Sequence, residues 1–161
     1  MEKKKVEIKA AVEPKSKVLV SVRDKDGKDN ALVVAYCCNC SYAPPMVMVG
    51  IVPSRYSYHM VKENPCFVVN LVSKDQKEIY KYLGSVSGRD EDKLAKINTK
   101  DGDVVNAPIL TDCPVNIECT VVDSIMTGSH EMFVGKIECV HADSDIINEK
   151  GEIDYSKIDF I

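Results

Sequence analysis

Two short stretches gather the hydroxyl and cationic side chains that could bind an anion. In the first, Ser54, Arg55 and Ser57 directly follow an apolar strand pattern. They begin a short helical pattern that ends at Asn64-Pro65. Backbone N–H groups at a helix start, two hydroxyls and a guanidinium can converge on one phosphate group. The same residues would also fit a capped helix that carries a surface arginine.

The second stretch, residues 84–93, supplies further hydroxyls, two glycines and two cations. Its candidate binding residues are Ser85, Ser87, Gly88, Arg89 and Lys93. They could close a pocket with the first stretch, or they could form a helix–loop–helix connection with an Asp-Lys pair on the surface. Asn70, at the end of another strand pattern, could contact the same anion or form a turn.

One C-x-x-C spacing, from Cys37 to Cys40, is the main alternative source of chemistry. A dithiol there could transfer electrons, whereas a zinc or iron–sulfur site would need about four ligands. Four cysteines further along the chain stand singly in strand patterns and are expected to pack as small apolar groups, and no metal site is predicted. His59 and His141 are expected to be structural. His130 follows a Thr-Gly-Ser turn, where it would be exposed.

The composition is that of a globular protein: 45% of the 161 residues are apolar and 29% are charged, with a net charge of −4. One domain over residues 1–161 is expected, with residues 1–14 as a flexible or edge segment. The net charge disfavours broad nucleic-acid binding. No apolar run has the length of a membrane span or a signal peptide, and seven cysteines without disulfide-scaffold spacing fit reduced thiols. A cytoplasmic location is therefore expected, with no membrane or nucleic-acid partner.

Strand patterns dominate the chain. Apolar runs predict strands over residues 17–23, 31–38, 46–52, 66–72, 115–125 and 131–142, with the strand at 46–52 in the interior of a sheet. Helices are predicted for the segment before Asn64-Pro65 and for residues 74–83, with a weaker one near Asp90. Residues 39–43 and 98–106 are expected to be loops. This order predicts a mainly β fold, a closed or nearly closed antiparallel barrel of Greek-key-like type with a few short helices.

An ordered set of motifs spans roughly residues 18–145. It comprises Asn30 at the head of a strand, Pro44-Pro45, Ser54-Arg55-Tyr56-Ser57, Phe67-Val68-Val69-Asn70, Gly84-Ser85-Val86-Ser87-Gly88-Arg89-Asp90 with Asp92-Lys93, Pro108-Ile109-Leu110, Gly128-Ser129-His130 and Phe133-Val134-Gly135-Lys136-Ile137. In this order the set resembles the flavin reductase-like, FMN-binding split-barrel family, which includes flavoredoxin-type proteins and ferric reductases of that fold.

The resemblance implies a homodimer that binds one FMN near each subunit interface. It implies that the phosphate and the ribityl chain meet Ser54, Arg55, Tyr56, Ser57, Asn70, Ser85, Ser87, Gly88, Arg89 and Lys93. Along the isoalloxazine ring it places Asn30, Ala31, Leu32, Val33, Cys38, Asn39, Cys40 and Ser41. His130 falls where the family often has a histidine close to the ring or to the nicotinamide site, which makes it the candidate catalytic residue.

We therefore predict an FMN-binding oxidoreductase that relays electrons from NAD(P)H or a protein donor to a small acceptor or a partner protein. The redox chemistry would belong to the cofactor. An acidic chain must concentrate cations, here Arg55, Arg89 and Lys93, where a phosphate of about two negative charges binds. Two alternatives stay open: a split-barrel module that holds a flavin or another phosphorylated ligand without turnover, and a redox or metal protein centred on Cys37 and Cys40.

Overall fold

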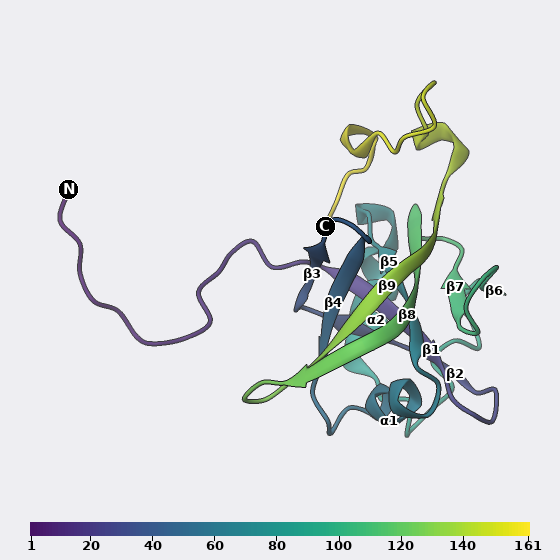
Figure 1. Ribbon diagram of the computed structural model, residues 1–161, viewed down its shortest axis with the longest axis horizontal. Helices are drawn as coiled ribbons and strands as arrows, with labels where there is room; N and C mark the ends of the chain where they lie inside the picture. The colour runs from purple at the N-terminus through teal and green to yellow at the C-terminus, as the bar shows by residue number, and fades with distance from the viewer.

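A curled antiparallel sheet dominates the computed structural model, which describes all residues from 1 to 161 (Figure 1). Seven strands pair in the order β2-β1-β5-β8-β9-β4-β3, and all neighbouring strands run antiparallel. Their bounds are β1 Val18–Arg23, β2 Asp29–Val34, β3 Cys37–Ser41, β4 Met46–Ile51, β5 Cys66–Leu71, β8 Val115–Met126 and β9 Glu131–Ala142. The mainly β, antiparallel fold class predicted from the sequence is confirmed.

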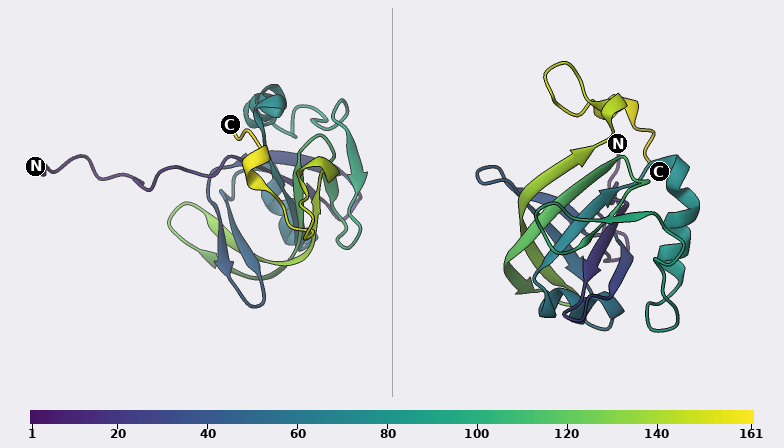
Figure 2. Two further views of the ribbon diagram at one scale, coloured as in Figure 1. Left: turned by 90° about the horizontal axis from the view of Figure 1, so that it is seen from above. Right: turned by 90° about the vertical axis from the view of Figure 1, so that its right-hand side faces the viewer.

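The sheet curls into a barrel that stays open (Figure 2). Its edges are β2 and β3, and no ladder of hydrogen bonds joins them. The main core lies inside, built from buried residues of six strands and of helix α1 (Tyr56–Glu63), among them Val20, Phe67 and Phe133. Successive side chains of a strand point to opposite faces, so the apolar residues of one face gather in this interior.

Helix α2 (Lys77–Ser85) covers the outer face of the barrel beside β1 and β2. Leu83 of α2 packs with Leu19 of β1 in a second core cluster. A 3-10 turn at Lys74–Gln76 leads into this helix, so the helix predicted for residues 74–83 begins in 3-10 form. Neither α1 nor α2 has the length and apolar character that crossing a membrane requires.

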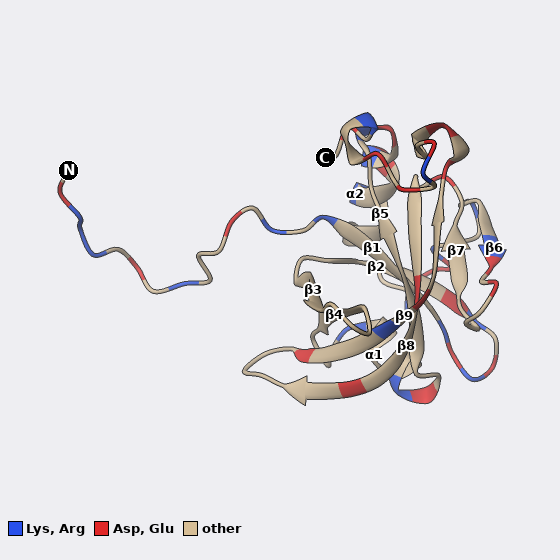
Figure 3. Cartoon of the chain, turned by 45° about the horizontal axis from the view of Figure 1, so that its top comes forward, with Lys and Arg blue, Asp and Glu red and all other residues tan.

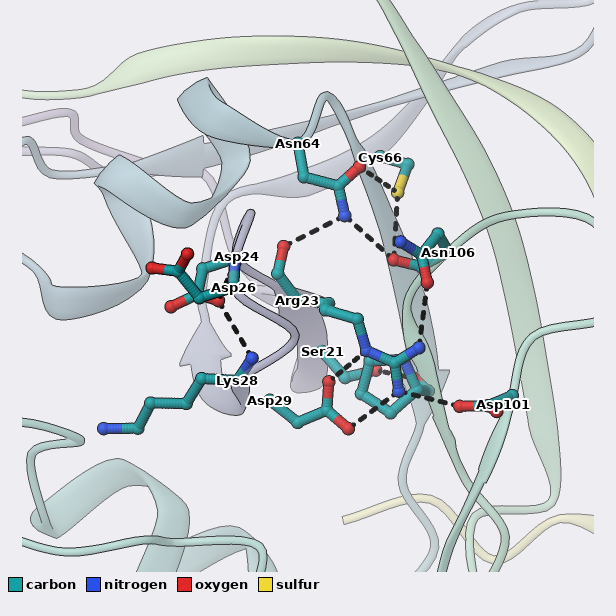
Figure 4. Close-up of polar contacts among 11 residues, drawn as sticks. Ser21, Arg23, Asp24, Asp26, Lys28, Asp29, Asn64, Cys66, Asp101 and Asn106 are labelled. Carbon is teal, nitrogen blue, oxygen red and sulfur yellow. Dashed lines mark hydrogen bonds and ion pairs between the residues drawn. The ribbon is translucent and has the colours of Figure 1, made fainter.

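A small lobe of two paired strands, β6 (Thr99–Asp101) and β7 (Pro108–Leu110), is fastened to the barrel by Arg23 (Figure 4). The guanidinium of Arg23 donates to both carboxylate oxygens of Asp29, at 2.7 and 3.0 Å, and to Asp101 Oδ1 at 2.7 Å. The Arg23 side chain is largely buried, so water screens these ion pairs less than it screens pairs at the surface.

Replacing Arg23 by methionine is expected to lower the free energy of unfolding by about 2 kcal/mol, because charge-assisted hydrogen bonds to both the barrel and the lobe are lost. Urea denaturation of the variant and of the wild-type protein measures the difference. Lys74→Met is the matched control: the Lys74–Asp159 ion pair is exposed and contributes about 0 to 1 kcal/mol. Equal stability of the Arg23→Met and wild-type proteins would contradict the role assigned to Arg23.

Four segments differ from the predictions. The strand predicted over residues 31–38 ends at Val34, and Cys37 and Cys38 begin the next strand, β3. Residues 39–43 were predicted to be a loop, but residues 39–41 belong to β3. Their backbone groups pair with those of β4, and the local sequence gives no sign of this pairing. Residues 98–106, also predicted to be a loop, contain β6. No helix forms near Asp90, where residues 88–90 and 93–96 make turns.

The two ends of the chain behave differently. Residues 1–16 form no regular secondary structure and run away from the barrel (Figure 1). The last residues fold back across the barrel end through 3-10 turns at Ser144–Ile146 and Tyr155–Lys157. Ile146 and Ile158 pack there with Val115 of β8, so this segment closes one end of the core.

Candidate functional site

A cavity of about 920 Å³ lies beside β2, one of the two edge strands of the open barrel. Residues of β2, the end of β4, the start of α1, the end of α2 and the loop after α2 line it. This volume is typical of small-molecule sites. The predicted site residues that line it are Asn30, Leu32, Val33, Ser54, Arg55, Tyr56, Ser57, Ser85, Ser87, Gly88, Arg89, Lys93 and His130. The two polar stretches identified in the sequence therefore meet in one cavity.

Four cations, Arg55, Lys81, Arg89 and Lys93, line this cavity. Lys93 is buried, and its Nζ donates a hydrogen bond to the carbonyl oxygen of Leu83 at 2.8 Å. Burial, and secondarily the positive charge of Arg55, lowers the pKa of Lys93 to about 8. Arg89 Nη2 donates to the carbonyl oxygen of Ser54 at 3.0 Å, which links the loop after α2 to the start of α1.

Tyr56 supports the loop that carries Arg89. The guanidinium carbon of Arg89 lies 5.7 Å from the centre of the Tyr56 ring, and Lys28 Nζ lies 4.9 Å from it. Lys28 Nζ also donates to the Tyr56 hydroxyl at 2.9 Å. Gly88 packs so closely that an added Cβ would stand 2.5 Å from Tyr56 Cδ1 and 2.8 Å from Asn30 Oδ1. A glycine is therefore required for the loop to close over this side of the cavity.

Asn30 and Ser57 join β2 to α1 at the base of the cavity. Asn30 Nδ2 donates to Ser57 Oγ at 2.8 Å, and both residues are buried. No side chain caps the start of α1, where Arg55 is the N-cap residue. Tyr58 N–H donates to the carbonyl oxygen of Arg55 at 3.0 Å. The N–H groups of Tyr56 and Ser57, the first two helical residues, have no intrahelical partner by helix geometry and can serve an anion in the cavity.

The β8–β9 hairpin brings His130 to the cavity. Its ring centroid lies 4.7 Å from that of Tyr36, with an interplanar angle of 53°, and its Nδ1 lies 2.8 Å from Ser129 Oγ. Gly50, near the end of β4, permits this arrangement, because an added Cβ would stand 2.6 Å from Met132 Sδ and 3.4 Å from His130 Cδ2. The pairing of β4 with β9 thus places a titratable ring at the cavity from a distant part of the sequence.

Two predicted site residues are fully buried instead and do not line the cavity. Ala31 of β2 packs in the core cluster beneath α2, where Leu19 and Leu83 surround it. Asn70 is also fully buried: its Oδ1 accepts hydrogen bonds from Leu110 N at 3.2 Å and from Asn116 Nδ2 at 2.8 Å. Its Nδ2 donates to Ser21 Oγ at 3.0 Å. Asn70 therefore joins β5 to β1, β7 and β8 and does not line the cavity.

Residues 38–41, which were predicted to lie beside a flavin ring, belong to the edge strand β3 and do not line the cavity. Cys38 is exposed, and Asn39, Cys40 and Ser41 line a second hollow of about 560 Å³. Cys37 packs against the main core, and burial, together with the charge of Cys38, raises its pKa to about 12. Cys37 is thus partly buried against the core, whereas Cys40 is exposed and lines the second hollow. A redox pair of Cys37 and Cys40 stays a prediction.

Sequence reasoning did not name ten of the lining residues as candidates: Val34, Ala35, Gly50, Ile51, Val52, Tyr80, Lys81 and Leu83, together with Gly84 and Val86 of the second polar stretch. Tyr80 and Gly84 are four positions apart on α2, so helical periodicity could have identified them as neighbours on one face. Lys28, which supports Tyr56 from the turn between β1 and β2, gives no local signal of its role.

A family model, a solved structure and sequence relatives are all similar to this chain. Residues 13–155 match the family described as "Flavin reductase like domain". The solved structure of flavoredoxin from Desulfovibrio vulgaris (Miyazaki F) is similar to this chain with a TM-score of 0.89 and 27% identity, over 97% of this chain and 85% of that chain.

Among sequence relatives, an uncharacterized protein from Aeropyrum pernix is 28% identical over 130 residues, which are 79% of this chain and 49% of the relative. The NADH:riboflavin 5'-phosphate oxidoreductase of Streptomyces pristinaespiralis is 26% identical over 117 residues, which are 73% of this chain and 65% of the relative. The match with these two relatives thus spans about half to two thirds of their length.

Proposed function

The chain belongs to the flavin reductase-like domain family, and on this premise we propose that it is an FMN-binding oxidoreductase. The observation that carries the proposal is the buried Lys93, which lines a cavity with Arg55 and Arg89 in an acidic chain. A buried ammonium that has one carbonyl as its partner favours an anionic ligand, because an unpaired buried charge is costly. Riboflavin 5'-phosphate, for which the Streptomyces relative is named, is FMN and carries such an anion.

The residues of the cavity fit the parts of FMN. Arg55, Arg89 and Lys93 would bind the phosphate, together with backbone N–H groups at the start of α1. Leu32 and Val33 of β2 add apolar side chains to the cavity lining, which suits the flavin ring. When bound, FMN would supply the redox chemistry by accepting a hydride and passing electrons on.

The affinity for FMN is expected to fall as the pH rises above 8. A phosphate beside Lys93 raises its pKa, which is about 8 without the ligand, so the bound state holds a proton that the free protein loses above pH 8. The phosphate is a dianion throughout this range. We expect an affinity about tenfold lower at pH 9 than at pH 7. Fluorescence titrations with FMN measure it, and a Lys93→Met protein should show a flat profile between these pH values.

We propose that NAD(P)H is the electron donor and that His130 and Tyr36 form the edge at which the nicotinamide approaches the flavin. The half-exposed His130 at the cavity, paired with the exposed Tyr36, supports this arrangement. An aromatic and polar edge of this kind can orient a flat ring by stacking and by hydrogen bonding.

Anaerobic mixing of the FMN-loaded protein with NADH or NADPH tests the oxidoreductase activity. The oxidised flavin absorption should bleach with at least one nucleotide, and an added flavin or ferric acceptor should give sustained turnover. His130→Asn should retain FMN but slow the bleaching about tenfold, because the nicotinamide is positioned less well. A loaded protein that neither nucleotide reduces would contradict the nicotinamide donor without affecting the assignment of the FMN site.

We further propose that two copies of the chain associate through the region of β3 and β4. Neither strand carries a charged side chain (Figure 3). Tyr42, between the two strands, is 97% exposed, and Ile125 and Met126 at the end of β8 are more than half exposed. Exposed apolar surface of this kind favours association between proteins. Sedimentation at micromolar concentration should give a dimer, and a monomer would contradict this proposal.

A further inference from the structure

A second group of reactive side chains lies on the β8–β9 hairpin, apart from the flavin cavity. Glu118 of β8 is the direct partner of Cys139 in the ladder, and His141 follows two positions later on β9. Residues two apart on a strand share one face of a sheet, as do directly paired residues on neighbouring strands. Pairing therefore brings a carboxylate, a thiol and an imidazole together, with their ligand atoms all within 4.8 Å of one another.

The carboxylate of this group is held in a fixed orientation. Glu118 is fully buried, and its oxygens accept hydrogen bonds from the backbone N–H groups of Asp103, Val104 and Val105 at 2.8 to 2.9 Å. These three residues belong to the connection between β6 and β7. The three backbone hydrogen bonds thus hold the Glu118 carboxylate in a preset geometry.

The distances suit a tetrahedral metal ion. Zn²⁺ binds sulfur at about 2.3 Å and nitrogen or oxygen at about 2.0 Å, which places a tetrahedral S···N pair about 3.5 Å apart and an N···O pair about 3.3 Å apart. Cys139 Sγ and His141 Nε2 are 3.5 Å apart, as a shared ion requires. His141 Nε2 and Glu118 Oε1 are 2.6 Å apart and share a hydrogen bond, so this pair would open by about 0.7 Å when an ion replaces the proton.

The surroundings of the group support ion binding. Asp103 Oδ2 lies 3.9 Å from Nδ1 of His141, the ring nitrogen that faces away from the group. A carboxylate on that side orients the ring of a metal-binding histidine and increases its basicity. Lys100 Nζ lies 3.7 Å from the other oxygen of Asp103 and partly offsets its charge. Cys139 and His141 are partly exposed, so an ion and a water ligand can reach the site from solvent.

We propose that Glu118 Oε1, Cys139 Sγ and His141 Nε2 bind one divalent ion of the Zn²⁺ class, with water in the fourth position. Mixed thiolate, imidazole and carboxylate ligands match the preference of Zn²⁺. The ion would stabilise the attachment of the β6–β7 lobe to the barrel, because Glu118 also binds the backbone of that lobe. These residues do not line the flavin cavity, so the site is independent of the proposed FMN function.

Titration of the chelator-stripped protein with Zn²⁺, and with Co²⁺ as a spectroscopic probe, tests the site. We expect one equivalent to bind, a rise in Tm with Zn²⁺ that EDTA reverses, and thiolate-to-cobalt charge-transfer absorption. Cys139→Ser and His141→Asn should each weaken binding at least tenfold, which is the effect that even the loss of an outer-shell partner causes. Cys38→Ser, which removes an exposed thiol elsewhere, is the matched control and should bind Zn²⁺ as the wild-type protein does.

Zn²⁺ binding by the Cys139→Ser protein distinguishes a metal site from a purely structural hydrogen bond between His141 and Glu118. If His141 and Glu118 form an ion pair without a metal role, this variant should leave both the Zn²⁺ affinity and the Zn²⁺-dependent rise in Tm unchanged. That result would overturn the proposal, as would a wild-type protein that binds no Zn²⁺ at micromolar concentration. Loss of binding in Cys38→Ser would overturn it too, because it would move the site to β3. Melting in EDTA confirms that each variant is folded.

Discussion

Replacing Lys93 by methionine is expected to weaken FMN binding about 30-fold to 100-fold. A charge-assisted hydrogen bond contributes about 1.5 to 3 kcal/mol, and in this buried position little water replaces it. The variant should fold, because methionine fills a similar volume without the cost of burying an ammonium group. Quenching of FMN fluorescence by the protein gives the dissociation constants.

Lys96→Met is the matched control for this experiment. Lys96 lies three residues further along the same loop but is exposed and does not line the cavity, so its loss should leave the affinity within a factor of two. Equal affinity of Lys93→Met and the wild-type protein would show that the buried ammonium does not contact the ligand. The phosphate would then have to bind elsewhere.

Gly88→Ala is expected to lower FMN affinity by more than tenfold and to destabilise the protein by about 1 to 3 kcal/mol. The new methyl group would stand 2.5 Å from a ring carbon of Tyr56 and 2.8 Å from Asn30 Oδ1. Neither can yield freely, because Lys28 holds the Tyr56 hydroxyl and Asn30 is bonded to Ser57. The loop must therefore move outward, as overpacked sites do, and it carries Arg89 and Lys93 with it.

The control for this substitution is Gly128→Ala, where an added Cβ meets nothing within 4 Å. Gly128→Ala should bind FMN normally, and its Tm should stay within a few degrees of the wild-type value. Thermal melts with and without FMN separate loss of stability from loss of binding. A Gly88→Ala protein with wild-type affinity would contradict the close approach of this loop to α1.

The parts of the fold that the sequence predicts well are those with a strong local pattern. The strands at residues 66–72, 115–125 and 131–142 and the helix ended by Asn64-Pro65 lie within one or two residues of their predicted bounds. Residues 39–41 of β3 were predicted to be a loop because they lack an alternation of apolar and polar side chains, and pairing with β4 decides their conformation. The turns near Asp90 were missed because packing of Lys93 and Leu94 into the protein overrides a weak helical pattern.

In the candidate site too, residues within a local sequence motif could be predicted, whereas residues that meet only through the fold could not. Residues 54–57 and 84–93 form local motifs, and the structure brings them together in one cavity. Asn70 shows the limit of this reasoning: an amide at a strand end looks the same in sequence whether it binds a ligand or crosslinks strands. The group of Glu118, Cys139 and His141 was not predicted either, because its members meet through the β8–β9 register, which one sequence alone does not reveal.

The central claim is that the cavity binds FMN through Lys93 and its neighbouring cations. The most direct measurement is the visible absorption spectrum of the purified protein after FMN is added and the excess is removed by gel filtration, with Lys93→Met and Lys96→Met measured alongside. We expect about one FMN to be retained per wild-type and Lys96→Met chain, and much less on Lys93→Met. A wild-type protein that retains no flavin, or three proteins that retain it equally, would contradict the claim.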